Sequence, residues 1–100
     1  MQTKPSFPAT WGEVKSLPLD SLTPYERNAR THSAKQIRQI ASSIEQFGFT
    51  SPVLVDHKGG IIAGHGRVEA ARLLGWTDVP TLCLDHLSEP QKRAYVIADN

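Results

Sequence analysis

The chain has 100 residues, of which 39% are hydrophobic and 21% are charged, and its formal net charge at pH 7 is +1. This length and composition fit one globular domain and exclude general disorder, a membrane-spanning segment and an N-terminal signal peptide, so we expect a cytoplasmic protein. Because Cys83 is the single cysteine, a disulfide within these residues and a zinc site built on several cysteines are also excluded.

The first half of the chain predicts a tail, a short strand and one long helix. Residues 1–10 contain two prolines and no periodicity, which indicates a flexible tail ahead of a domain over residues 11–100. Residues 13–17 alternate polar with apolar side chains, as in a half-buried strand, and Pro18 should end it. A helix is expected over residues 33–48, with a capping box between Ser33 and Gln36 and a stop at Gly48. Its apolar stripe consists of Ile37, Ile40, Ala41, Ile44 and Phe47.

The second half predicts a hairpin, two helices and one more strand. Residues 52–56 and 61–63 are expected to pair as strands around a turn at residues 58–60. A short helix should run from Arg67 to a stop at Gly75, followed by a strand over residues 79–84 that contains Cys83 as a small buried hydrophobe. A last helix should begin at Ser88, with Gln91 three residues later completing a capping box. The sequence contains no cap signal at Asn100, so we expect this helix to be truncated. This order predicts an α+β fold with a small mixed sheet and about three helices.

The strongest candidate site is the junction Gly64-His65-Gly66-Arg67, where a predicted strand leads into a predicted helix. The first N–H groups of a helix have no intrahelical partner and lie at the positive end of its dipole, so they attract anions. Glycines allow the backbone to approach a phosphate closely, and the guanidinium of Arg67 can bind two phosphate oxygens. The pattern alone is common in proteins, and it equally fits a tight turn followed by a surface arginine.

A basic stretch precedes the long helix and supports an anionic partner. Residues 27–38 contain no acidic side chain and carry Arg27, Arg30, His32, Lys35 and Arg38. The same residues could equally form a solvated helix face and its approach loop. His65 has a side chain whose pKa lies near neutrality, so it could act as an acid or base beside a bound phosphate, or could simply bind backbone.

From about residue 17 to residue 100 the sequence resembles the N-terminal domain of the ParB family, whose fold is shared with sulfiredoxin. Residues 28–33 resemble the Asn-Pro-Arg block before the first helix, with Ala29 in place of proline. Residues 48–55 and 60–64 resemble the hairpin that leads into the family signature Gly-x-x-Arg-x-x-Ala, which here begins at Gly64. Residues 98–100 resemble the Glu-Asn block of the last helix, with Asp99 in place of glutamate.

The resemblance implies a domain that binds a nucleoside triphosphate, CTP or ATP, together with Mg²⁺. The phosphate-contacting candidates implied by the matching blocks are Arg30, Gly64, Gly66, Arg67 and Asn100. His32 and His65 are further candidates because they lie beside the predicted helix starts, although each could equally be a histidine with no role in binding. Asp99 and Asn100 are the implied metal ligands, since carboxylate and amide oxygens suit Mg²⁺. The resemblance also implies DNA as a partner of the full-length protein, and it leaves a homodimer open.

Two departures from the family pattern change what is expected. ParB proteins show Gly-Glu-Arg-Arg at the signature, whereas this chain has His65 and Gly66 in the middle and one arginine fewer, which predicts weaker triphosphate binding. Sulfiredoxin places its catalytic cysteine directly after the signature glycine, where this chain has His65, so peroxiredoxin repair is not supported. The amino-acid sequences of these blocks are most similar to those of ParB-like domains that precede DNA methyltransferase domains in phage and mobile-element proteins.

Three functions therefore remain open from the sequence. The first is a nucleotide-binding regulatory domain of a DNA-associated protein. The second is a ParB-like nuclease, phosphotransferase or slow nucleotide hydrolase, for which His65 and Asp99 are the candidate catalytic residues and Glu69 is a further candidate base. The third is a DNA-binding module that needs no nucleotide and uses Arg27, Arg30, Lys35 and Arg38.

Overall fold

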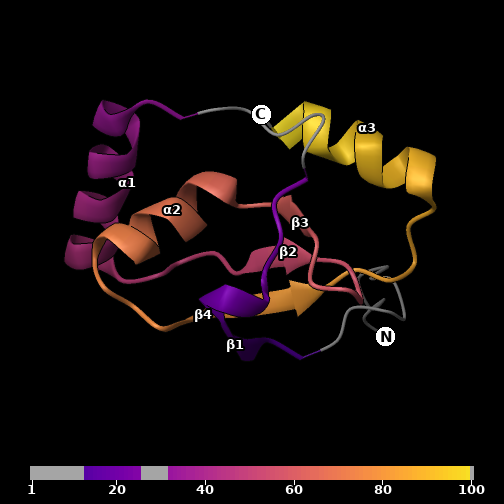
Figure 1. Cartoon of the computed structure of the whole chain (residues 1–100), viewed down its shortest axis with the longest axis horizontal. Coiled ribbons are helices and arrows are strands. Elements are labelled where there is room, and N and C mark those ends of the chain that lie inside the picture. The colour runs from indigo at the N-terminus through magenta and orange to yellow at the C-terminus, as the bar shows by residue number, and fades with distance from the viewer. Residues whose placement is uncertain (1–12, 26–31, 100) are drawn as a thin grey trace, which may run out of the picture.

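The computed structural model describes residues 13–25 and 32–99, and it has the α+β fold expected from the sequence (Figure 1). Its four strands form one sheet, and three α-helices pack around it. In chain order the elements are β1 (Lys15–Pro18), the 3₁₀ turn η1 (Leu19–Ser21), α1 (Ala34–Phe47), β2 (Val53–Val55), β3 (Ile61–Ala63), α2 (His65–Leu73), β4 (Asp78–Cys83) and α3 (Glu89–Asp99).

The sheet is mixed, with the strand order β1-β4-β2-β3. The hairpin strands β2 and β3 are antiparallel, as expected, and β1 is antiparallel to β4. The two central strands, β2 and β4, are parallel, so the chain must cross over between them. That crossover contains β3 and α2, which places the start of α2 directly after a strand of the sheet.

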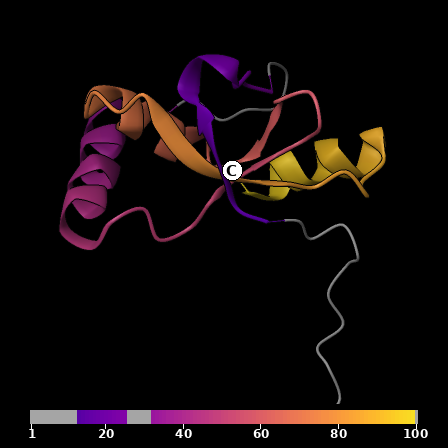
Figure 2. The same ribbon diagram turned by 90° about the horizontal axis from the view of Figure 1, so that it is seen from below.

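Alternation along the strands sends neighbouring side chains into different parts of the core. Val53 and Val55 of β2 pack with Val68 and Ala71 of α2, whereas Leu54 between them packs in a second cluster. That second cluster is completed by Ile62, Leu82, Leu84 and Val96, the last of which lies on α3. Helices α2 and α3 therefore cover opposite faces of the sheet, and their different positions are visible in the view from below (Figure 2).

Helix α1 packs mainly on α2. Ala41 and Ile44 are buried against Ala70, as the apolar stripe predicted. Phe47 was expected in the same stripe, and that prediction is wrong, because its side chain is 72% exposed. The reason is length: α1 has 14 residues and α2 only nine, so the stripe is longer than the helix that covers it.

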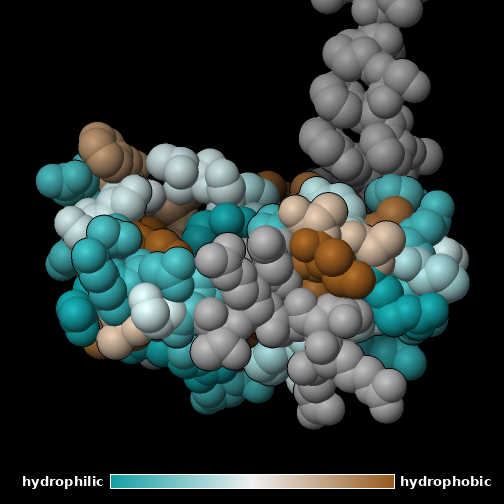
Figure 3. Space-filling model, turned by 90° about the horizontal axis from the view of Figure 1, so that it is seen from above, coloured by the Kyte–Doolittle hydropathy of each residue, from teal (hydrophilic) through white to brown (hydrophobic). Residues whose placement is uncertain are grey.

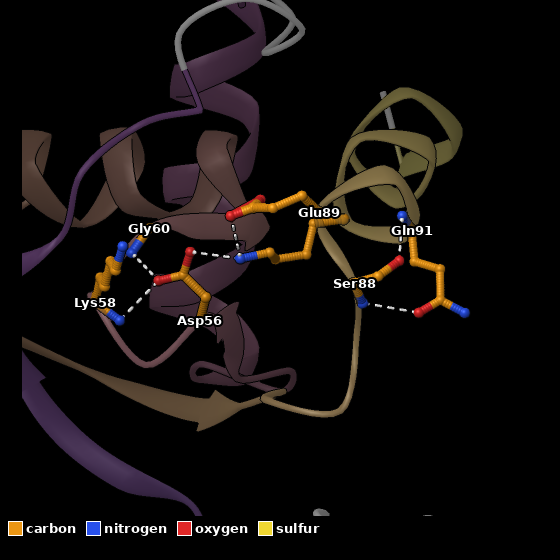
Figure 4. A network of polar contacts seen from close by, with 7 residues as sticks. Asp56, Lys58, Gly60, Ser88, Glu89 and Gln91 are labelled. Carbon is orange, nitrogen blue, oxygen red and sulfur yellow. Dashed lines mark hydrogen bonds and ion pairs between the residues drawn. The ribbon is translucent and has the colours of Figure 1, made fainter.

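The predicted caps of the long helices are confirmed. The Oγ of Ser33 accepts a hydrogen bond from Gln36 N at 3.1 Å, and the Oε1 of Gln36 accepts one from Ser33 N at 2.9 Å. The same reciprocal pair joins Ser88 and Gln91 at the start of α3 (Figure 4). Each pair satisfies backbone donors that the first turn of a helix leaves without partners.

The first strand differs from its prediction. Strand β1 begins at Lys15, and Val14 before it is 58% exposed, so the expected half-buried alternation is present only at Leu17. Pro18 ends the strand, as expected, and is its last paired residue, opposite Asp78. A proline is tolerated there because β1 lies at the edge of the sheet.

Hydrophobic side chains that remain exposed are scattered rather than gathered. Figure 3 shows the upper surface as mostly hydrophilic, with only small hydrophobic patches between polar residues. The exposed large hydrophobic residues come from different segments and are Val14, Phe47, Leu73, Trp76, Tyr95 and Ile97. Trp76 packs with Phe49, and their ring centroids are 5.7 Å apart. No helix among the described residues is long and apolar enough to cross a membrane.

Candidate functional site

The candidate site is the start of α2, where Gly64 caps the helix in the left-handed region at φ 106°. The first helical hydrogen bond runs from Val68 N to Gly64 O at 3.0 Å, so the three residues between them form the first turn. Their N–H groups have no acceptor within the helix. The expected start at Arg67 is therefore two residues too late, and His65 and Gly66 belong to the helix and not to a preceding loop.

Gly66 has a packing reason to be inside a helix despite its low helix propensity. A Cβ at this position would lie 2.8 Å from Ile40 Cδ1 and 3.0 Å from His32 Nε2. The missing side chain therefore allows α1 and the residue before its cap to approach the first turn of α2 closely. This approach brings His32 to the tip of α2.

A small pocket of about 210 Å³ lies at this helix tip. Apart from Ile40, its lining consists of residues singled out in the sequence, namely His32, Gly64, His65, Gly66, Arg67 and Asp99. Three separate elements contribute to it: the approach to α1, the first turn of α2 and the last turn of α3. Two further candidates, Arg30 and Asn100, lie outside the described residues, so their positions stay predictions.

His65 is the most buried ionisable residue of this pocket, with 7% of its surface exposed. Its Nε2 atom accepts a hydrogen bond from the backbone N–H of Tyr25 at 3.2 Å. Its Nδ1 atom is buried and has no hydrogen-bond partner among the described residues. Burial lowers the pKa of His65 below its ordinary value, and the nearby carboxylate of Asp99 opposes this shift only in part.

Arg67 folds back over the start of its own helix. Its Nη2 atom donates to the carbonyl oxygen of Pro52 at 3.1 Å, while its Nε atom is buried without a partner among the described residues. Burial lowers the pKa of the guanidinium and the charge of Asp99 raises it, but an arginine remains charged in either case. The carbonyl bond fixes the cation at the pocket wall.

Asp99 brings a carboxylate to the same pocket from the last described turn of α3. Its charge acts on both His65 and Arg67, as their pKa shifts record. Among residues 13–25 and 32–99, however, no group of three or more metal-ligating side chains could hold an ion by itself. Any metal at Asp99 would therefore need ligands from water and from a bound molecule.

The remaining candidates lie elsewhere. Lys35 and Arg38 are exposed on α1 and do not line the pocket, and Arg27 lies outside the described residues. Glu69 is exposed on α2, as expected of a solvated side chain. Cys83 is only partly buried, and burial, with the charges of Asp85 and Asp56, raises the pKa of its thiol. A raised pKa keeps the sulfur protonated and weakly nucleophilic.

Tyr25 is a site contact that the sequence did not reveal. It contributes through its backbone N–H, which any residue except proline carries, and its partner His65 is 40 positions away. The segment before it is fixed by the hairpin, because Thr23 N donates to Gly59 O at 2.9 Å and Ile61 N donates to Thr23 O at 2.8 Å. A fold prediction alone could not have identified this contact.

A second polar cluster joins α3 to the hairpin and holds the helix in place (Figure 4). The side chain of Lys92 is 8% exposed, and its amine lies 3.5 Å from Asp56 Oδ2 and 3.1 Å from Glu89 Oε1. Asp56 Oδ1 also accepts hydrogen bonds from the N–H groups of Lys58 and Gly60, which shape the turn. The cluster fixes the helix whose last turn carries Asp99.

Comparison with known proteins identifies the family. The sequence matches the family model described as ParB N-terminal domain over residues 6–100. The chain belongs to the ParB N-terminal domain family. It is 55% identical over 76 residues to the ParB-like nuclease domain-containing protein YnaK of Escherichia coli (strain K12), covering 76% of this chain and 87% of YnaK. It is 30% identical over 93 residues to the nucleoid occlusion protein of Bacillus cereus (strain AH187), covering 88% of this chain but 32% of that protein.

Solved structures show which fold the chain shares. The domain is similar to the C-terminally truncated chromosome-partitioning protein ParB of Caulobacter crescentus, solved with CTP-gamma-S, with a TM-score of 0.77 and 24% identity over 89% of this chain and 53% of that one. It is also similar to sulfiredoxin from Arabidopsis thaliana, with a TM-score of 0.68 and 19% identity over 85% of this chain and 98% of that one. A free serine kinase solved with AMP shares the fold, with a TM-score of 0.65 and 22% identity over 87% of this chain and 37% of that one. The ParB/sulfiredoxin-like fold is thereby confirmed.

Proposed function

We propose that this ParB-like domain binds the phosphate groups of a nucleotide at the tip of α2. The observation that carries the proposal is that two residues lining one pocket, His65 and Arg67, each have a buried polar atom, Nδ1 and Nε, without a partner among the described residues. Leaving such a group unpaired costs about 1–3 kcal/mol. A ligand with several acceptor oxygens would satisfy both atoms.

The backbone of α2 supports the same ligand class. The N–H groups of its first turn lack helical acceptors, and the helix dipole places partial positive charge at this end. Phosphate oxygens suit such donors, because they carry negative charge and accept hydrogen bonds from several directions. The glycines at positions 64 and 66 add no side chains of their own to this turn, and the space beside them is occupied by the side chains of Arg67, Ile40 and His32.

The charge of the described pocket indicates how a triphosphate would be bound. It holds one guanidinium, Arg67, and one carboxylate, Asp99, so these two charges cancel. Mg²⁺ would supply the missing positive charge, and Asp99 fits it as a single hard oxygen ligand beside phosphates and water. We therefore propose a nucleoside triphosphate, CTP or ATP, bound with Mg²⁺, and retain Arg30 and Asn100 as further contacts.

Relatives with the same fold support a nucleotide and a DNA partner. ParB of Caulobacter crescentus has been solved with CTP-gamma-S and with the centromeric parS site, and the free serine kinase with AMP. This chain spans 53% of the nucleotide-bound ParB chain and 32% of the nucleoid occlusion protein, so DNA binding is proposed for a longer protein. A following DNA methyltransferase domain, a phage or mobile-element source and a homodimer stay predictions.

Catalysis remains a separate hypothesis. The expected acid or base role of His65 is weakened because its Nε2 atom already accepts a hydrogen bond and its pKa lies below the ordinary value. Asp99 could still orient water on a bound metal. Nuclease, phosphotransferase and slow nucleotide hydrolase activities therefore stay predictions that steady-state assays on the same protein can test.

The experiment is a calorimetric titration of CTP, ATP and GTP with Mg²⁺ into the wild type and two arginine variants. Arg67→Ala should weaken binding by roughly 1.5–3 kcal/mol, the usual loss for a hydrogen bond to a charged group. Arg72→Ala is the matched control, since Arg72 lies on the same helix but contacts Leu19 O and Asp20. If no nucleotide binds at millimolar concentration to a chain extended past Asn100, the proposal fails.

A further inference from the structure

We infer that His65 is held with its proton on Nδ1 by the backbone of Tyr25, and that this ring serves as a neutral hydrogen-bond donor to the bound phosphate. The donor role rests on the proposed nucleotide binding. It assigns a chemical task to a position at which ParB proteins carry glutamate, a side chain that accepts hydrogen bonds when ionised.

The tautomer follows from the bond to Tyr25. A backbone N–H can only donate, so the Nε2 atom that it contacts at 3.2 Å must present a lone pair. A neutral imidazole with a free lone pair on Nε2 carries its hydrogen on Nδ1. A doubly protonated ring would place two donors opposite each other, so this contact also excludes the imidazolium form.

The Tyr25 amide is held firmly enough to impose this choice. Thr23 is bridged to Gly60, and its backbone makes hydrogen bonds to the hairpin on both sides, at 2.9 Å to Gly59 O and 2.8 Å from Ile61 N. Pro24 lies between Thr23 and Tyr25 and restricts the backbone there. The ring is likewise fixed, because His65 lies in the first turn of α2 and is 7% exposed.

The resulting donor is buried and has no partner among the described residues, and His65 is one of the residues that line the pocket. A phosphate oxygen at the tip of α2 would accept from Nδ1–H and from the backbone donors of the same turn. Because the ring is neutral, it recognises acceptor oxygens without adding charge, and its protonated Nδ1 cannot remove a proton from a ligand. His65 is thus assigned to ligand binding and not to general-base catalysis.

Two amide substitutions at position 65 test the donor role of Nδ1 and the acceptor role of Nε2 separately. Asparagine places its amide at about the position of Nδ1, and glutamine places its amide at about the position of Nε2. His65→Asn therefore keeps a donor toward the pocket and loses the Tyr25 partner, whereas His65→Gln does the reverse. With pyrophosphate and Mg²⁺ as the probe, His65→Gln should bind on the order of tenfold or more weakly than His65→Asn.

The wild-type tautomer is measured independently by ¹⁵N NMR of histidine-labelled protein at neutral pH. We expect a protonated Nδ1 in the free protein and a shift of that proton when pyrophosphate is added. A ring protonated on Nε2, or a His65→Gln variant that binds as tightly as His65→Asn, overturns the inference while nucleotide binding stands. If the wild type has the Nδ1–H ring but binds neither pyrophosphate nor nucleotide, the proposed function and the donor role both fail.

Discussion

The guanidinium of Arg67 lies over the backbone of Gly64, with Nη2 only 2.9 Å from the point where a Cβ on Gly64 would sit. Gly64 also has φ 106°, in the region that L residues avoid. Gly64→Ala should therefore lower the free energy of unfolding by roughly 1–2 kcal/mol through backbone strain. It should also displace Arg67 and weaken pyrophosphate binding. Urea unfolding and calorimetry measure the two effects separately.

Gly75→Ala is the matched control for this substitution. Gly75 has φ 80° and no heavy atom within 4 Å of an added Cβ, so it carries the strain without the collision. It should lose similar stability and keep the affinity for pyrophosphate. Equal losses of affinity in both variants would show that strain, and not the position of Arg67, controls the pocket.

Asp99 should make binding depend on Mg²⁺. Without a metal its carboxylate repels a phosphate in the same pocket, and with Mg²⁺ it becomes a ligand. Asp99→Asn should therefore strengthen binding of pyrophosphate in the presence of a chelator and reduce the gain that Mg²⁺ gives. Titrations at several Mg²⁺ concentrations check this.

Glu69→Gln provides the control, because Glu69 also acts on His65 but is exposed and does not line the pocket. This variant should keep the Mg²⁺ dependence of the wild type. If Asp99→Asn keeps it as well, Asp99 is not a metal ligand.

Asp56 should contribute to stability in a way that disappears in acid. Burial raises the pKa of Asp56, but hydrogen bonds from Gly60 and Lys58 and the charge of Lys92 outweigh it, so the pKa lies below 3.8. A lowered folded-state pKa gives stability that is complete above the unfolded value and lost as pH falls through the folded value. The Asp56→Asn variant should therefore have a lower free energy of unfolding near neutral pH. This free energy should also fall less steeply than that of the wild type as the pH is lowered.

The measurement is the urea midpoint from neutral pH down to about pH 2, below the ordinary pKa of aspartate. Asp20→Asn is the control, since the side chain of Asp20 is 98% exposed and should change the profile little. If the urea midpoint of Asp56→Asn falls with decreasing pH as steeply as that of the wild type, other carboxylates determine the acid sensitivity.

Lys92 should hold α3 on the hairpin. Its removal leaves the Asp56 carboxylate, whose side chain is 11% exposed, without its cation. Lys92→Met should lower the free energy of unfolding by about 1–3 kcal/mol, even though methionine fills similar space. Arg93→Met changes the exposed neighbour on the same helix and should cost much less. Thermal and urea unfolding compare the two, and equal losses would contradict this role of Lys92.

Local chemistry was sufficient to predict most elements of the fold. Ser33 with Gln36, and Ser88 with Gln91, identified the helix starts because capping depends on residues three positions apart. The start of α2 was misplaced because Gly66, a poor helix former, is retained for close packing with α1. Such a contact is set by the tertiary structure and leaves no local signal.

In the candidate site, too, the features with a local sequence signal were predictable and those set by tertiary structure were not. Gly64 to Arg67 are adjacent in sequence, so their chemistry was recognisable as a unit. His32 was recognised from its position before the helix start, and resemblance to the ParB family added Asp99. The strand pairing and the docking of α3 bring these distant residues together at one pocket. The contact between Tyr25 and His65 could be recognised only in the folded structure, because a backbone N–H has no sequence signature.

The outer strands of the sheet are poor templates for aggregation. Strand β1 has four residues and ends in Pro18, which has no N–H to offer an incoming strand. Strand β3 has three residues, and its Ile61 N–H is already used by Thr23 O. Addition of a second molecule at either of these described strand edges could therefore form very few backbone hydrogen bonds.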